Sequence, residues 1–219
     1  MNVIVSKTAI DDLRNDMDNG TLTLVVVNHD LYIYGYLIIG PMLVLVNTPI
    51  FLLVMIRKAF RERYLVLAII FLNGGLTGIS AILMGMKRWI ISAAEELYIA
   101  HYDCVLNVPI FLLSMFFLDG WGLLMNSAER LTVVAFPLFY YTHSKRIAYS
   151  LIVTQYAITI IAITFTAMES LIEPIRYVSH FCLLKDVYNP YFYLTLTLLS
   201  SIASLFSIIL MVIVVAMLK

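Results

Sequence analysis

The stretch at 126–141, NSAERLTVVAFPLFYY, decides how this chain is interpreted. It closes a long apolar run that begins near Val105, and it places the acid Glu129 directly before the base Arg130. Ionisable residues at membrane depth are costly and usually functional, whereas a lone arginine at an interface can reach water along its apolar stem. Because the arginine is accompanied by an acid and, further on, by Pro137, the pattern favours a functional element over an interfacial anchor.

The composition indicates a membrane protein. Of the 219 residues, 62% are hydrophobic and 13% are charged, whereas a soluble domain is about half apolar and a quarter charged. Lipid is the simplest partner for so much apolar surface. The 14 basic and 14 acidic residues balance, which argues against nucleic acid, since phosphate binding needs a basic surface. Two cysteines exclude a multi-cysteine zinc site, and we expect neither a metal nor a cofactor.

Five stretches are long and apolar enough to cross a bilayer as helices, which takes about 20 residues each. They do not alternate in the way that the strands of a closed barrel do. The expected spans are residues 31–56, 64–86, 105–136, 148–172 and 191–218. The sequence therefore predicts an all-α fold, a five-helix transmembrane bundle at 31–219, preceded by an extracellular tail at 1–30.

Small residues at spacings of four predict close helix packing in lipid. Gly74 and Gly78 have this spacing in the second span, as do Ser200 and Ser204 in the fifth. We interpret both pairs as packing within the bundle.

Basic residues near the span ends predict the orientation of the bundle. The second loop sets Lys87 and Arg88 against three acids, and the fourth loop is similarly mixed. The first and third loops are the more basic ones, with Arg57, Lys58, Arg61, Arg63, Lys145 and Arg146. These two loops are therefore expected in the cytoplasm, and the N-terminus outside. Asn19 agrees, because it begins the one Asn-x-Ser/Thr glycosylation sequence, which is used only on the lumenal side.

Both cysteines fall on the outer side in this topology. Cys104 lies at the outer end of the third span, and Cys182 lies in the loop before the fifth. Both would meet the oxidising lumen during synthesis. A bond between them would hold that loop across the third span, and closing a loop of this length contributes about 4 kcal/mol in the chain-entropy account. We predict this disulfide in preference to two unpaired thiols.

The segment ERLTVVAFPLFY at 129–140 resembles the end of the third helix of rhodopsin-like G-protein-coupled receptors. In that family an acid and an arginine are followed, seven residues after the arginine, by a Pro-Leu or Pro-Ile pair. Leu131 stands here in place of the family's usual tyrosine. The stretch SKRIAY at 144–149 makes the chain most similar to the nematode serpentine chemoreceptors of the Srsx class. The five spans would then correspond to helices one to five of a seven-helix receptor, truncated after the fifth.

This resemblance implies a switch at the inner end of the third span. Glu129 would hold Arg130 in the resting state, through a pair that curls around the helix end, because adjacent helical residues do not stack. Once freed by an agonist, Arg130 would contact the α subunit of a heterotrimeric G protein, and Leu138 would insert into a pocket on that subunit. The other matching positions of the motif are Leu131, Val134, Pro137 and Tyr140.

Three polar residues inside the spans resemble the family more weakly. Asn47 stands where the family keeps an asparagine, and Asn73 is nearest to its buried aspartate of helix two. Asp119 lies about three turns from Arg130, so the carboxylate would have moved from the second helix to the third. We expect either a buried polar group that could hold a sodium ion, or a core acid paired with Asn73 or a water.

A ligand pocket is expected in the outer half of the bundle, near Leu112, Phe116 and Tyr193. Amine receptors of the family carry an aspartate at the position of Leu112, so the resemblance argues against an amine ligand. It implies a small apolar or peptide-like ligand, and an integral protein of the plasma membrane or of a sensory cilium.

Other classes of function are less well supported by the sequence. An enzyme is not expected, because the four histidines, His29, His101, His143 and His180, form no pair at helical spacing and no phosphate-binding loop is present. A small transporter subunit would show repeated halves, and the chain has no internal repeat. The remaining alternative is a non-signalling truncated protein that associates with full-length receptors.

Overall fold

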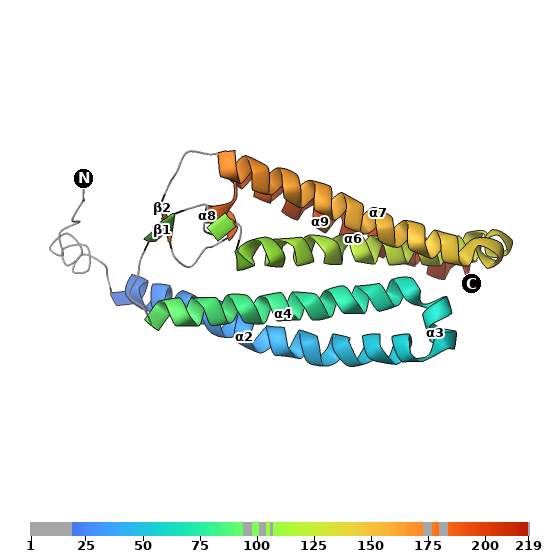
Figure 1. Cartoon of the computed structure of the whole chain (residues 1–219), viewed down its shortest axis with the longest axis horizontal. Coiled ribbons are helices and arrows are strands. Elements are labelled where there is room, and N and C mark those ends of the chain that lie inside the picture. Colours follow the sequence, from blue (N-terminus) through green and yellow to red (C-terminus); the bar gives the residue numbers. More distant parts are fainter. Residues whose placement is uncertain are drawn as a thin grey trace.

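In the computed structural model, the described residues are 19–93, 98–100, 104–105, 107–172, 177–179 and 184–218. Five long helices lie side by side along the longest axis of the molecule (Figure 1). They are α2 (Asn19–Ile56), α4 (Leu65–Ala93), α6 (Val108–Ala135), α7 (Pro137–Ile172) and α9 (Pro190–Met217). The predicted all-α fold with five long apolar helices is confirmed.

Two helices begin earlier than the sequence predicts. The helix α2 starts at Asn19, 12 residues before Leu31, where the first span was predicted to begin. The helix α7 starts at Pro137, so the segment 137–147, expected as a loop, is helical. Its start follows from the proline, because the residue before a proline is driven out of the helical conformation. Phe136 accordingly has φ −133° and ψ 63° and separates α6 from α7, and proline is favoured at a first helical position because it lacks an N–H.

Short elements connect the long helices at the two ends of the bundle. The helix α3 (Lys58–Arg63) joins α2 to α4. At the opposite end lie α8 (Leu184–Val187) and a two-stranded antiparallel sheet (Figure 1). In this sheet β1 (Tyr98–Ala100) pairs with β2 (Tyr177–Ser179), with Tyr98 opposite Ser179. The sheet, which the sequence did not predict, joins the connection after α4 to the connection after α7.

The helices α2 and α4 approach each other at glycines. A Cβ on Gly78 would lie 2.7 Å from the Gly40 carbonyl oxygen, and one on Gly40 would lie 2.9 Å from that of Gly78. A Cβ on Gly74 would lie 2.9 Å from Oδ1 of Asn47. Because any side chain at these positions would meet the facing helix, the glycines permit the close packing that their spacing predicts.

The helices α6 and α9 are joined by hydroxyl groups. A Cβ on Gly120 would collide with Oγ of Ser200 and lie 2.8 Å from its carbonyl oxygen. The Ser200 hydroxyl donates to the Phe116 carbonyl at 3.3 Å. Further along, the Ser207 hydroxyl donates to the Leu123 carbonyl at 3.0 Å. These hydroxyls give α9 a defined register against α6.

The apolar core lies toward the end of the bundle that carries α8. Tyr188, just after α8, is buried, and its hydroxyl donates to the Val105 carbonyl at 3.1 Å. Burial raises the pKa of the Tyr188 phenol above its usual value. The buried apolar cluster consists of Met84, Cys104, Val105, Leu112, Leu113, Phe117, Ile163, Ala167, Leu184, Val187, Tyr188 and Leu196. This cluster fixes the start of α6 relative to α8 and α9.

Candidate functional site

The segment 126–141 forms the end of α6, the break at Phe136 and the first turn of α7. Across this break the Tyr140 hydroxyl donates a hydrogen bond to Oε1 of Glu129 at 2.9 Å. Glu129 is 1% exposed, and its second oxygen, Oε2, has no hydrogen-bond partner among the described residues. Since a buried carboxylate needs donors, the single bond from Tyr140 holds the start of α7 against α6.

Arg130 turns away from Glu129. Its guanidinium carbon lies 5.3 Å from the ring centroid of Tyr64, at the start of α4, in a cation–π arrangement. The Glu129–Arg130 switch stays a prediction, and the described carboxylate of Glu129 and guanidinium of Arg130 form no salt bridge in this structure. The reason is geometric, because successive residues of an α-helix point about 100° apart, so Glu129 faces α7 while Arg130 faces α4.

A groove of about 510 Å³ lies beside Arg130. Its described lining residues are Tyr64, Arg130, Val133, Pro137, Tyr140, Tyr141, Ser144 and Lys145. Three of the residues predicted for the switch, Arg130, Pro137 and Tyr140, thus come together here. Leu138 lies elsewhere on the first turn of α7 and is 85% exposed. Leu131 and Val134 are half-buried on α6 and do not line the groove.

Asp119, in the middle of α6, is paired with a residue that the sequence did not single out. The Thr77 hydroxyl of α4 lies 2.8 Å from Oδ2 of Asp119 and 3.0 Å from the Asn73 carbonyl oxygen. The carboxylate is therefore bonded to Thr77 and not to the Asn73 side chain. The Asn73 amide instead accepts a hydrogen bond from the Tyr156 hydroxyl at 2.8 Å.

Asn47 lies apart from this pair. Its amide donates to the Leu43 carbonyl of its own helix at 2.8 Å, and no hydrogen bond to Asn73 or Asp119 is seen among the described side chains. The described residues also contain no cluster of three or more His, Cys, Asp or Glu that could hold a metal. The sodium ion stays a prediction.

Sequence reasoning missed Gln155 of α7. It is 1% exposed, and neither amide atom has a hydrogen-bond partner within the described part of the chain. A Cβ on Gly122 would lie 3.7 Å from Oε1 of Gln155 and 3.9 Å from Nδ2 of Asn73. Gly122 thus leaves space between two buried amides. A glutamine inside a predicted span was the available signal, since polar groups in lipid need partners.

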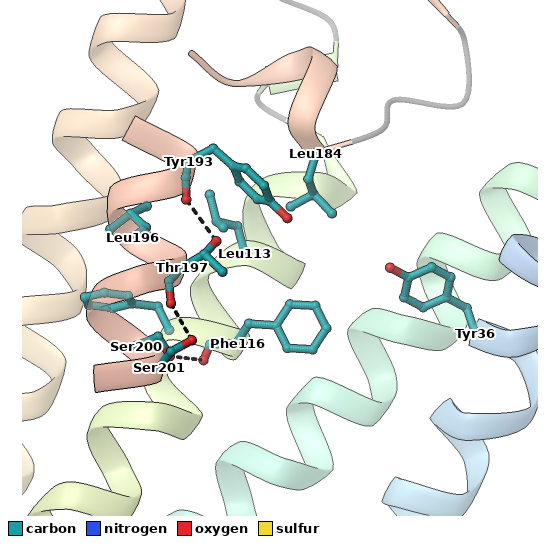
Figure 2. Close-up of a pocket in the computed structure, with 10 residues that line it drawn as sticks. Tyr36, Leu113, Phe116, Leu184, Tyr193, Leu196, Thr197, Ser200 and Ser201 are labelled. Carbon is teal, nitrogen blue, oxygen red and sulfur yellow. Dashed lines mark hydrogen bonds between the residues drawn. The ribbon is translucent and has the colours of Figure 1, made fainter. Parts of the chain in front are cut away.

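A second cavity, of about 280 Å³, lies toward the other end of α6. Its lining residues are Tyr36, Leu113, Phe116, Phe117, Leu184, Tyr193, Leu196, Thr197, Ser200 and Ser201. Figure 2 shows Tyr36 reaching in from α2, across the cavity from Tyr193 of α9 and Leu184 of α8. Phe116 and Tyr193, two of the three residues predicted for a ligand pocket, line this cavity, and its role as a ligand site stays a prediction. Leu112 does not line it, because it is buried in the apolar core.

Arg88 adds a buried cation near this cavity. The sequence assigned it to the second loop, but α4 continues to Ala93, and Arg88 is 2% exposed. Its guanidinium carbon lies 5.0 Å from the ring centroid of Tyr36. The same tyrosine therefore contacts a charged group on α4 and lines the cavity.

Two predicted features concern residues at the edge of the described structure. Cys104 is buried and disulfide-bonded. The chain's second cysteine, Cys182, lies outside the described residues. Asn19 is the first residue of α2, and its side chain is likewise outside the described part.

The five long helices define the class of protein. Each contains a stretch of suitable length and hydropathy to cross a bilayer. The first of these five stretches is Ile33–Ile56, and the last is Pro190–Met217. The chain is an integral, multi-pass membrane protein. Comparison with protein-family models, with curated proteins and with solved structures found no match.

Proposed function

We propose that this protein is a receptor of the rhodopsin-like type that conveys an extracellular chemical signal to a heterotrimeric G protein. The observation that carries the proposal is the position of α6 between two cavities. Phe116 lines the cavity toward the α8 end, and Arg130 lines the groove at the other end. The two residues are separated by about 21 Å along the helix. One long helix thus lines a ligand-sized cavity and a basic groove toward opposite ends of the bundle.

The contacts at the inner end suggest how the switch is held at rest. The Glu129 carboxylate is bonded to Tyr140, and the Arg130 guanidinium is stacked on Tyr64. In the proposed mechanism Arg130 is released from Tyr64, the residue before α4, rather than from Glu129, when α6 and α4 move apart. Leu138 is already exposed on the first turn of α7, where a G-protein α subunit could bind it.

The cavity toward α8 favours a small, largely apolar ligand. The described residues that line it are aromatic, aliphatic or hydroxyl-bearing, and none of them is charged. Thr197 and Ser201 donate their hydroxyl protons to carbonyls of their own helix (Figure 2). Pockets of this kind take their specificity from a few such polar groups. The ligand we propose is therefore largely apolar and carries a polar group that can meet these hydroxyls. The N-terminal side of α2 would face the outside of the plasma membrane.

The proposal can be tested without knowing the ligand. We would express the chain in cells with a panel of G proteins and measure G-protein dissociation in the absence of agonist. Glu129→Gln should raise basal signalling, because a neutral amide holds the Tyr140 hydroxyl less strongly than a carboxylate does. Arg130→Gln should remove signalling, whereas Arg146→Gln, which removes the same charge from an exposed position outside the groove, should leave it unchanged.

A complete lack of G-protein coupling would contradict the proposal. If wild type and all three variants reach the cell surface and none couples to any G protein, the receptor proposal fails. Association with other membrane chains would then be the function to test, by co-purification of tagged copies from those cells.

A further inference from the structure

Side chains from two helices meet beside Gly122, near the middle of α6. Gln155 of α7 is 1% exposed, and Asn73 of α4 is fully buried. A Cβ on Gly122 would lie 3.7 Å from Oε1 of Gln155 and 3.9 Å from Nδ2 of Asn73. Since α6 runs from Val108 to Ala135, Gly122 lies about 20 Å from either end of that helix. The two amides therefore lie at the level of the hydrocarbon core.

Three of the four polar atoms of these two amides have no hydrogen-bond partner in the described part of the chain. They are Oε1 and Nε2 of Gln155 and Nδ2 of Asn73. The fourth atom, Oδ1 of Asn73, accepts a hydrogen bond from the Tyr156 hydroxyl at 2.8 Å. Because burying a polar group without a partner is costly, and lipid supplies no partner, these three atoms need a further ligand.

The chemistry of the three atoms favours water over an ion. The two amide nitrogens are hydrogen-bond donors, which disfavour a cation, and Oε1 of Gln155 is an acceptor, which disfavours an anion. Water can accept from the nitrogens and donate to the oxygen. A buried water typically makes about three hydrogen bonds to groups of this kind.

Gly122 differs from the glycines that bring helices into contact. A Cβ on Gly78 would lie 2.7 Å from the Gly40 carbonyl oxygen, so that glycine is filled against the facing backbone. A Cβ on Gly122 would approach the neighbouring helices no closer than 3.5 Å, at Ile70. The absence of a side chain at Gly122 thus provides room beside the two amides.

We propose that ordered water binds beside Gly122 and links the Asn73 amide of α4 to the Gln155 amide of α7. The hydrogen bond from Tyr156 to Oδ1 of Asn73 orients the amide for this role, because it directs Nδ2 of Asn73 to the side of Gly122. The water is then a polar connection between helices at a depth where lipid cannot provide one. The inference is independent of G-protein coupling.

The direct test is a crystal structure of the full chain grown in a lipid mesophase, at a resolution that shows ordered water. We expect water density about 2.7–3.2 Å from Nδ2 of Asn73 and from an amide atom of Gln155. In Gly122→Ser the serine hydroxyl should replace that density. Amides that bond directly to each other or to other side chains, with no water density between them, would overturn the proposal.

Thermal unfolding of variants gives a second test. Gly122→Ala puts a methyl group beside the amides, whereas Gly122→Ser puts a hydroxyl there that can bond to them. The serine variant should therefore melt about 2 °C or more above the alanine variant. Gly35 is the matched control, because nothing lies within 4 Å of a Cβ added there. At Gly35 alanine should melt at or above serine, since alanine is the better helix former. The same order at both positions would overturn the proposal.

Discussion

The Tyr140 hydroxyl lies 2.9 Å from the Glu129 carboxylate, across the break between α6 and α7. The bond joins residues on two helices whose axes part at Phe136. It attaches the first turn of α7, including the exposed Leu138, to the end of α6. A hydrogen bond to a buried acid thus contributes to the orientation of this exposed turn.

Removing the Tyr140 hydroxyl should therefore destabilise the chain and loosen α7. Tyr140→Phe leaves the buried Glu129 carboxylate without its donor, at a cost of about 1–3 kcal/mol in the free energy of unfolding. Tyr141→Phe is the matched control, since that side chain is 87% exposed and surface changes are usually within about 0.5 kcal/mol. Thermal unfolding of the purified variants measures both. Equal stability of the two variants would show that the bond does not hold α7.

The close approach of α2 and α4 gives a second prediction. Gly78→Ala places a Cβ 2.7 Å from the Gly40 carbonyl oxygen, so the backbones must separate. We expect a loss of about 2 kcal/mol or more, in the range for overpacked cores. Gly35→Ala makes the same change where nothing lies within 4 Å, and it should be neutral or slightly stabilising. Melting temperatures of both variants check this, and an unaffected Gly78→Ala would contradict the packing described.

The bond between Thr77 and Asp119 can be measured with a double-mutant cycle. Thr77→Ala, Asp119→Ala and the double variant should show a coupling energy of about 1–3 kcal/mol, because a hydrogen bond to a charged group is lost in either single variant. The control cycle pairs Thr77 with Ser114, whose hydroxyl donates to the Ile110 carbonyl of its own helix. A coupling as small as in that control would mean that Asp119 is held by other partners.

Orientation can be checked at Asn19. This residue precedes Leu31, the predicted start of the first span, by 12 residues, or about 18 Å of helix. If the N-terminal side faces the lumen, the chain expressed in glycosylating cells should carry one glycan. Treatment with a glycosidase should then increase its gel mobility, and Asn19→Gln should reproduce that mobility untreated. Absence of any glycan would count against the predicted orientation.

The long helices could be predicted because each is marked by a continuous run of apolar residues in the local sequence. Each apolar run exceeds the length of the hydrocarbon core, and the glycine spacing at Gly74 and Gly78 indicates where helices meet. The segment 137–147 misled the prediction because its polar and basic residues resemble a loop. In the structure these residues continue α7, since a helix that emerges from the bilayer has its backbone hydrogen bonds satisfied whatever its side chains are.

The pairings within the candidate site could not be predicted, because they depend on how the helices pack. Glu129 and Arg130 are neighbours in sequence, yet the partner of Glu129 is Tyr140 on α7 and the partner of Arg130 is Tyr64, between α3 and α4. Thr77, the partner of Asp119, lies 42 positions away, and nothing in its local sequence marks it. A motif thus indicates which residues are unusual, whereas the partner of each depends on helix rotation and on the break at Phe136.

The contact of Gly120 with Ser200 and the hydrogen bond of Ser207 attach α9 to α6 at two points. These two serines are seven residues, or about 10 Å, apart along α9. Two separate points of attachment oppose rotation as well as sliding of one helix on the other. A displacement of α9 at the cavity therefore takes α6 with it, and the two helices move as one body.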